Sequence, residues 1–175
     1  MKKLLITLFL LIVFINFRLM YLKESFFEAV AEYLILSVLL ICISAVDLEK
    51  EIIPDSTVAL MIMNRLAYII LFETDFSALL SGLFTGFLNA AVMLLAALMV
   101  YRRIKKMPVG LGDVKLMFAI GVYFDPLENQ MLIVISCLCC LSAFVIIKRK
   151  DRLPFGPFIS FSALMILLYK SALSV

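Results

Sequence analysis

Seven apolar stretches, separated by short charged segments, constrain this sequence more than any other feature. A helix needs about 20 apolar residues to cross a bilayer core. Hydrophobic residues make up 65% of the 175 positions, whereas a soluble domain is about half apolar. The excess extends over the whole length, so we expect an all-α polytopic membrane helix bundle with about seven spans, near residues 4–22, 29–46, 56–72, 76–101, 114–124, 130–147 and 158–172.

The first apolar stretch resembles a signal peptide, because Lys2 and Lys3 precede it. However, Asn16-Phe17-Arg18 stands where a small-residue cleavage site is expected, so we interpret the stretch as an uncleaved anchor. The sequence therefore predicts a single integral membrane domain, with an N-terminal anchor helix at residues 1–26 and a six-helix core at residues 27–175.

Basic residues alternate between the two sides of the predicted bundle. If the N-terminus is inside, the inner segments hold Lys2, Lys3, Lys50, Arg102, Arg103, Lys105, Lys106, Lys115, Lys148, Arg149, Lys150 and Arg152. The outer segments are acidic and hold Glu24, Glu73, Asp75, Asp125 and Glu128. Cytoplasmic loops of membrane proteins carry the excess of Lys and Arg. We therefore expect a cytoplasmic N-terminus in a plasma membrane, with Asp47 and Asp113 both at the inner face.

The amino-acid composition excludes several classes of catalytic site. The chain contains no His, which excludes Ser-His-Asp and Cys-His catalysis and the common zinc sites. Its four cysteines lie in apolar runs, so we expect them to pack as small apolar residues. We predict no metal and no cofactor. The lipid bilayer is an expected partner, and a nucleic acid is not.

Two acidic segments interrupt the apolar pattern: residues 47–55, beginning with Asp47, and Gly110-Leu111-Gly112-Asp113-Val114-Lys115. An ionisable residue at the edge of a membrane core is a functional candidate. Two carboxyls that share a site can act as acid and base, because one pKa rises and that group stays protonated. The same residues could instead bind ions or protons in a small transporter, or belong to a non-catalytic subunit of an assembly.

The fifth stretch is too short to span. Eleven helical residues cover about 16 Å, against a core of about 30 Å. The Gly110–Asp113 segment therefore dips into the membrane, or the helix lies inside the bundle. Gly110 and Gly112 would permit a tight backbone and close approach of a substrate strand. Lys115 could neutralise the site, meet an acidic substrate residue, or extend to the inner surface.

Three further features have structural interpretations. Gly82-x-x-x-Gly86 lets helices approach closely. Asp55, after Pro54, is expected to cap the third helix. Arg65 lies deep in the third stretch, with Glu32, Glu73 and Asp75 as candidate partners.

Three motifs together resemble the type IV prepilin peptidases. Residues 110–116 resemble their G-x-G-D-x-K-L motif, and residues 47–55 resemble their first aspartate segment, which ends in Pro-Asp or Pro-Asn. Pro154-Phe155-Gly156-Pro157-Phe158 is similar to the stretch that opens their last helix. The resemblance implies an aspartic endopeptidase of the bacterial inner membrane that removes short basic leaders from prepilins or pseudopilins on the cytoplasmic side. It implies Asp47 and Asp113 as the catalytic pair, and we expect Gly156 to serve helix packing near the site.

The chain departs from full-length members of that family in one respect. They carry a cytoplasmic insert with paired C-x-x-C zinc sites, and many also methylate the new N-terminus. Here a short loop without cysteine joins the first two spans. The sequence therefore resembles a compact, peptidase-only form. It leaves open which precursor is cut, which machine the precursor serves, and whether the chain forms a homodimer.

Overall fold

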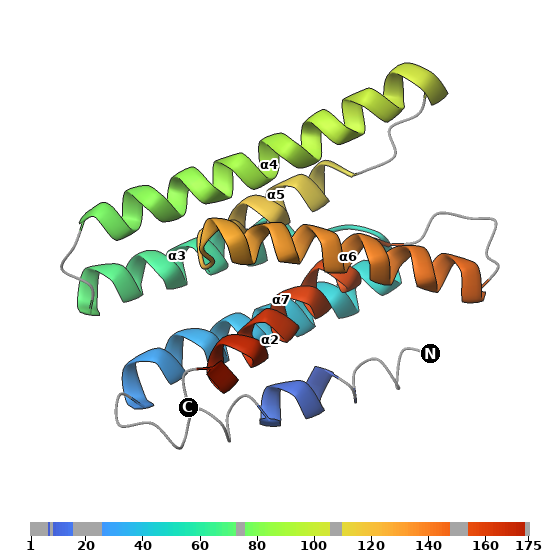
Figure 1. Cartoon of the computed structure of the whole chain (residues 1–175). Helices are drawn as coiled ribbons and strands as arrows, with labels where there is room; N and C mark the ends of the chain where they lie inside the picture. Colours follow the sequence, from blue (N-terminus) through green and yellow to red (C-terminus); the bar gives the residue numbers. More distant parts are fainter. Residues whose placement is uncertain are drawn as a thin grey trace. The chain divides into compact units, whose positions relative to one another are not determined.

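The computed structural model describes residues 7, 9–15, 26–72, 76–105, 110–147 and 154–173. Six helices follow one another along the chain, and residues 9–15 are helical as well (Figure 1). The helices are α2 (Phe26–Lys50), α3 (Asp55–Phe72), α4 (Phe76–Ile104), α5 (Leu111–Gly121), α6 (Pro126–Ile147) and α7 (Gly156–Leu173). None of the described residues lies in a strand. The predicted all-α class is confirmed.

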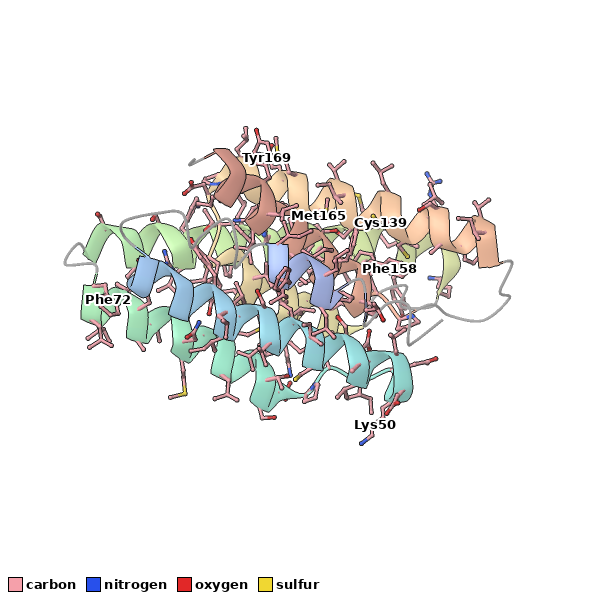
Figure 2. The ribbon with its side chains drawn as sticks, turned by 90° about the horizontal axis from the view of Figure 1, so that it is seen from below. Lys50, Phe72, Cys139, Phe158, Met165 and Tyr169 are labelled. Carbon is pink, nitrogen blue, oxygen red and sulfur yellow. The ribbon has the colours of Figure 1, made fainter. Side chains whose placement is uncertain are left out.

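Several helices have the length and composition of membrane spans. In the described part of the chain these are Asp55–Phe72 in α3, Leu79–Arg103 in α4 and Pro126–Ile146 in α6, and Gly156–Lys170 is a shorter apolar helix. Large apolar side chains point outward, such as Phe72 at the end of α3 and Tyr169 on α7 (Figure 2). An apolar outer surface is what a bilayer solvates, so the chain is a helical membrane protein.

The chain divides into two compact units. The terminal unit contains residues Met1–Glu51 and Gln130–Val175, and the central unit contains Ile52–Asn129. In the terminal unit α2 packs along α7 (Figure 1). The ring of Phe9 meets that of Phe161 of α7 edge to face, with centroids 6.2 Å apart. The expected division into an anchor at residues 1–26 and a core at 27–175 stays a prediction.

In the central unit α5 packs against α4 and α3. Glycines make the α4–α5 contact possible. A Cβ at Gly82 would lie 2.9 Å from the carbonyl oxygen of Val122, and one at Gly86 would lie 2.7 Å from that of Phe118. Since real Cβ atoms do not approach this closely, only glycine allows the two helices their present distance. The predicted role of Gly82-x-x-x-Gly86 is confirmed.

Helix α5 is as short as predicted but begins three residues earlier. It has 11 residues and runs from Leu111 to Gly121, instead of 114–124. Gly110 is its N-cap, so Asp113 lies inside the first turn rather than before the helix. At 1.5 Å per residue the helix is about 16 Å long, too short to cross a membrane alone.

Helix α2 continues past the predicted end of the second span. It runs to Lys50, which places Asp47 in its last turn rather than in a loop. Glu51 then adopts a left-handed conformation (φ 55°), and its N–H donates to the Asp47 carbonyl at 2.9 Å. This is a common way for a helix to end. Residues 16–25, 73–75, 106–109 and 148–153, which include the loops expected after the third and sixth spans, lie outside the described residues.

Candidate active site

Asp47 is a buried carboxyl held by the start of another helix. Its side chain is only 4% exposed. The backbone N–H of Gly156, the first residue of α7, donates to Asp47 Oδ2 at 3.0 Å. The N-terminus of a helix carries unpaired N–H groups and a partial positive charge, so it is a favourable place for a carboxylate. The α2–α7 packing of the terminal unit thus brings together two residues that are 109 positions apart.

The surroundings of Asp47 favour its protonated form. Asp47 lies just beyond the apolar stretch expected to span, residues 29–46. Burial raises its pKa above the ordinary 3.8, and the charge of Glu51 raises it further. The Gly156 N–H acts in the opposite direction but does not cancel the effect of burial. A carboxyl that keeps its proton more tightly than usual is suited to acid–base chemistry.

Asp113 is half-buried and lies in the first turn of α5. The N–H of Gly110 donates to Asp113 Oδ2 at 3.1 Å, and the Asp113 N–H donates back to the Gly110 carbonyl at 3.1 Å. The carboxyl therefore forms the return half of a capping box. Each of the two predicted catalytic aspartates accepts a hydrogen bond from a glycine N–H beside a helix start. Asp47 belongs to the terminal unit and Asp113 to the central unit.

The two glycines before Asp113 have different surroundings. Gly110 has φ −71° and ψ 148°, an extended conformation open to other residues. A Cβ at Gly112 would lie 3.1 Å from Cβ of Ile53. Gly112 therefore lets α5 approach the segment that leads into α3. A Cβ at Gly110 would lie 3.3 Å from Asp113 Oδ2, which is a crowded contact although the φ and ψ of Gly110 are ordinary. The close approach of a substrate strand to Asp113 stays a prediction.

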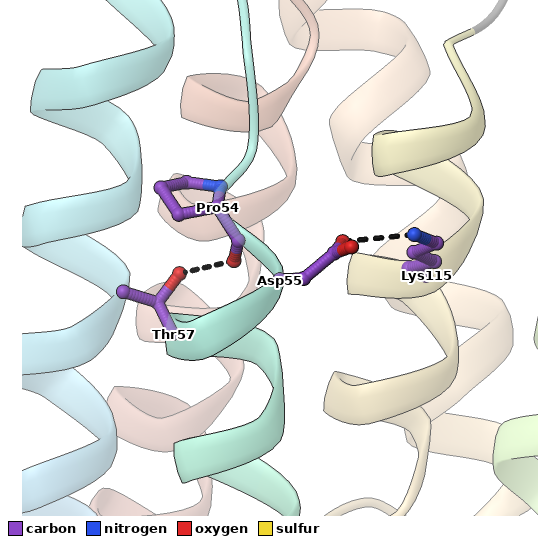
Figure 3. Close-up of polar contacts among 4 residues, drawn as sticks. All are labelled: Pro54, Asp55, Thr57 and Lys115. Atoms are coloured by element: carbon purple, nitrogen blue, oxygen red, sulfur yellow. Dashed lines mark hydrogen bonds and ion pairs between the residues drawn. The ribbon is translucent and has the colours of Figure 1, made fainter.

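Lys115 forms an ion pair with Asp55, at 2.8 Å between Nζ and Oδ1 (Figure 3). The two side chains are 53% and 75% exposed, so the pair contributes at most about 1 kcal/mol. Asp55 is the first residue of α3 and bonds to Lys115 rather than capping the helix as predicted. Thr57 instead donates its hydroxyl to the Pro54 carbonyl at 2.7 Å (Figure 3).

Arg65 lies among aromatic rings of the central unit. Its guanidinium carbon is 5.6 Å from the ring centroid of Tyr68 and 5.9 Å from that of Tyr123, both within cation–π range. Of the predicted carboxylate partners, Glu32 belongs to the terminal unit, and Glu73 and Asp75 lie outside the described residues. Their pairing with Arg65 stays a prediction.

Sequence reasoning missed a buried polar cluster at the end of α5. Thr85 Oγ1 and Asn129 Nδ2 donate to the Gly121 carbonyl at 2.9 Å and 3.1 Å. Asn129 also donates to the Phe124 carbonyl, and its Oδ1 accepts from Asn89 Nδ2 at 2.7 Å. The signal was Asn89, together with Thr85 one turn earlier, in a predominantly apolar stretch.

No group of three or more His, Cys, Asp or Glu side chains in the described part of the chain could hold a metal ion.

Comparison with known proteins identifies the family. The model of the type IV leader peptidase family matches residues 34–146. The chain belongs to the type IV leader peptidase family. The matched segment contains both Asp47 and Asp113, and Gly156 follows it. No curated protein and no solved structure matched the chain.

Membership of this family makes the chain a peptidase of the membrane. It favours the peptidase interpretation over the transporter and the non-catalytic subunit that the carboxyls alone left open. Prepilin-type proteins are the class of substrate that the family implies.

Proposed function

We propose that this leader peptidase is an aspartic endopeptidase that cleaves the short basic leader from type IV prepilin or pseudopilin-like precursors. Asp47 and Asp113 are its catalytic pair. The observation that carries the proposal is the environment of Asp47, a carboxyl that is 4% exposed, whose pKa burial raises, and that still accepts an N–H hydrogen bond. Buried carboxyls with a raised pKa and a defined orientation are typical of catalytic sites.

The chemistry requires one ionised and one protonated carboxyl. The ionised carboxyl takes a proton from the water that attacks the carbonyl carbon of the scissile bond. The protonated carboxyl gives its proton to the carbonyl oxygen. The C–N bond of the tetrahedral intermediate then breaks, and the leaving amine takes up the proton that came from water. At the same time a hydroxyl of the intermediate returns a proton to the carboxylate that had donated one, so the C=O bond re-forms and the pair regains its starting protonation. Because two such groups titrate as a unit, we assign these roles to the pair.

The proposal places the enzyme in the bacterial plasma membrane as a multi-pass protein with a cytoplasmic N-terminus. The distribution of basic residues supports this orientation. Arg102 and Arg103, in the last turn of α4, are exposed, as is Lys105 directly after it. Asp47 and Asp113 would then both work at the cytoplasmic face, where the basic leader of a precursor lies.

A cleavage assay tests the function. The full chain is co-expressed with a pilin-like precursor from the same genome, and the mass of the precursor is followed. We expect a mass loss equal to the leader. Asp47→Asn and Asp113→Asn should each abolish cleavage, because Asn is of similar size but cannot transfer a proton.

Both variants must reach the membrane at the native level, which serves as the control for folding. The mass of the product also reports whether a methyl group is added, and we expect none. Cleavage that continues in either variant would remove that aspartate from the catalytic pair. No cleavage of any candidate precursor by a well-folded chain would contradict the proposed substrate class.

A further inference from the structure

The Asp47 carboxyl occupies the space that a side chain at position 156 would fill. A Cβ at Gly156 would lie 2.6 Å from Oδ2, 3.1 Å from Cγ and 3.4 Å from Cβ of Asp47. These three atoms are the nearest that such a Cβ would meet, and all belong to one side chain. The glycine therefore leaves room for one specific neighbour, the candidate catalytic carboxyl.

The backbone at Gly156 does not need glycine for its own conformation. No glycine among the described residues has a positive φ, so an alanine could adopt the same backbone angles. The absent side chain matters because it allows the carboxyl to reach the N–H of residue 156. At 3.0 Å and in a buried place, this is a strong, charge-assisted hydrogen bond when Asp47 is ionised.

The bond distinguishes the two oxygens of Asp47. Oδ2 accepts from the Gly156 N–H, and Oδ1 makes no hydrogen bond to any described residue. An oxygen that carries a proton accepts poorly from an N–H, so a protonated Asp47 holds its proton on Oδ1. Oδ1 is then the atom that exchanges protons with water or substrate.

We propose that Gly156 is a positioning residue, whose N–H and missing side chain hold Asp47 by Oδ2 and leave Oδ1 to carry the catalytic proton. The inference rests on the proposed function, in which Asp47 is catalytic. Asp113 has a parallel contact, because its Oδ2 accepts from the Gly110 N–H.

Gly156→Ala tests the proposal in the purified full-length enzyme. The added Cβ would displace the free end of a side chain, so the fold should persist with a near-native Tm. The carboxyl should move by several tenths of an ångström or more. A misplacement of about 1 Å costs roughly 100-fold in rate, so we expect kcat to fall by that order. KM should stay unchanged, and the pH profile of kcat should be displaced, because Asp47 loses its donor.

Gly121→Ala is the matched control. There a new Cβ would lie 2.6 Å from the backbone Cα of Gly86, which cannot move aside. This variant should lose thermal stability, and the pH profile of its remaining activity should be native. Gly156→Ala that keeps native kcat and a native pH profile would overturn the inference.

A second measurement needs neither activity nor the alanine variant. The amide ¹H and ¹⁵N resonances of Gly156 should shift with pH as Asp47 titrates, and this shift should vanish in Asp47→Asn. A Gly156 amide that does not respond to pH would also overturn the inference. If Asp47→Asn still cleaves, the proposed function fails instead, and the amide titration still reports on the bond.

Discussion

The ionisation of Asp47 opposes folding, because burial raises the pKa of this carboxyl and so disfavours its charged form. Its pKa in the folded protein lies above the ordinary 3.8. The folded state therefore binds a proton more tightly than the unfolded chain does. Because of this difference in proton binding, the free energy of unfolding falls as the pH rises from about the ordinary pKa of the carboxyl to its raised pKa. At higher pH the free energy of unfolding stays lower by the same amount.

Asp47→Asn should remove this effect. Asn cannot ionise, and its carbonyl oxygen can still accept from the Gly156 N–H. We expect the variant to match the native protein at acidic pH and to exceed its stability at neutral pH. Thermal unfolding in detergent at a series of pH values measures the difference, and 1 kcal/mol corresponds to about 2–4 °C for a chain of this size. A native protein that gains on the variant as pH rises would contradict the prediction.

At the scale of helices, the buried polar cluster fixes the end of α5. The last carbonyl groups of a helix have no partner within it. Here side chains of Thr85 and Asn129 supply donors to the Gly121 carbonyl, and Asn89 holds the amide of Asn129. Asp113 lies at the other end of the same 11-residue helix. The cluster therefore helps to set where that aspartate stands within the central unit.

Asn129→Leu should destabilise the protein. Leucine has the same branched arrangement of side-chain heavy atoms but offers neither the donors for the Gly121 and Phe124 carbonyls nor the acceptor for Asn89. A buried polar group left without a partner costs about 1–3 kcal/mol, so we expect a loss of at least that size in thermal unfolding. Leu127→Ala, at a position of α6 that is 66% exposed, is the control and should change little. Equal effects of the two variants would show that the cluster contributes no stability.

Local patterns predicted the helices well and long-range polar contacts poorly. The apolar runs, Gly82-x-x-x-Gly86 and the shortness of α5 follow from spacing within one stretch, and the structure agrees. The Lys115–Asp55 pair joins residues 60 positions apart, and the Asp47–Gly156 bond joins residues 109 apart. No periodicity encodes such contacts, because they depend on which helices pack together. Position 156 was expected only to pack near the site, and its N–H was overlooked.

At the scale of the whole molecule, the proposed mechanism demands that Asp47 and Asp113 share one water molecule. Cysteines introduced at both positions test this demand. The four native cysteines, Cys42, Cys137, Cys139 and Cys140, are first replaced by alanine or serine.

We expect a short thiol-reactive cross-linker to join Asp47→Cys to Asp113→Cys within one chain in native membranes. The cross-link is detected by mass spectrometry of the digested protein. The chains with only one of the two cysteines, Asp47→Cys or Asp113→Cys, are the controls and should form no cross-link within one chain. If the double variant resists cross-linking while each cysteine reacts alone, the two carboxyls do not share a site.

The distance along the chain between Asp47 and Gly156 also bears on biosynthesis. During synthesis, Asp47 is added to the chain first. Gly156, which begins α7, is added 109 positions later. Until then the carboxyl has no N–H to bind, although the segment that defines the family, residues 34–146, is already complete. Helix α7, which is synthesised after the matched segment, thus supplies the contact that orients Asp47. A nascent or truncated chain that ends before residue 156 would carry both aspartates and still lack the contact that orients one of them.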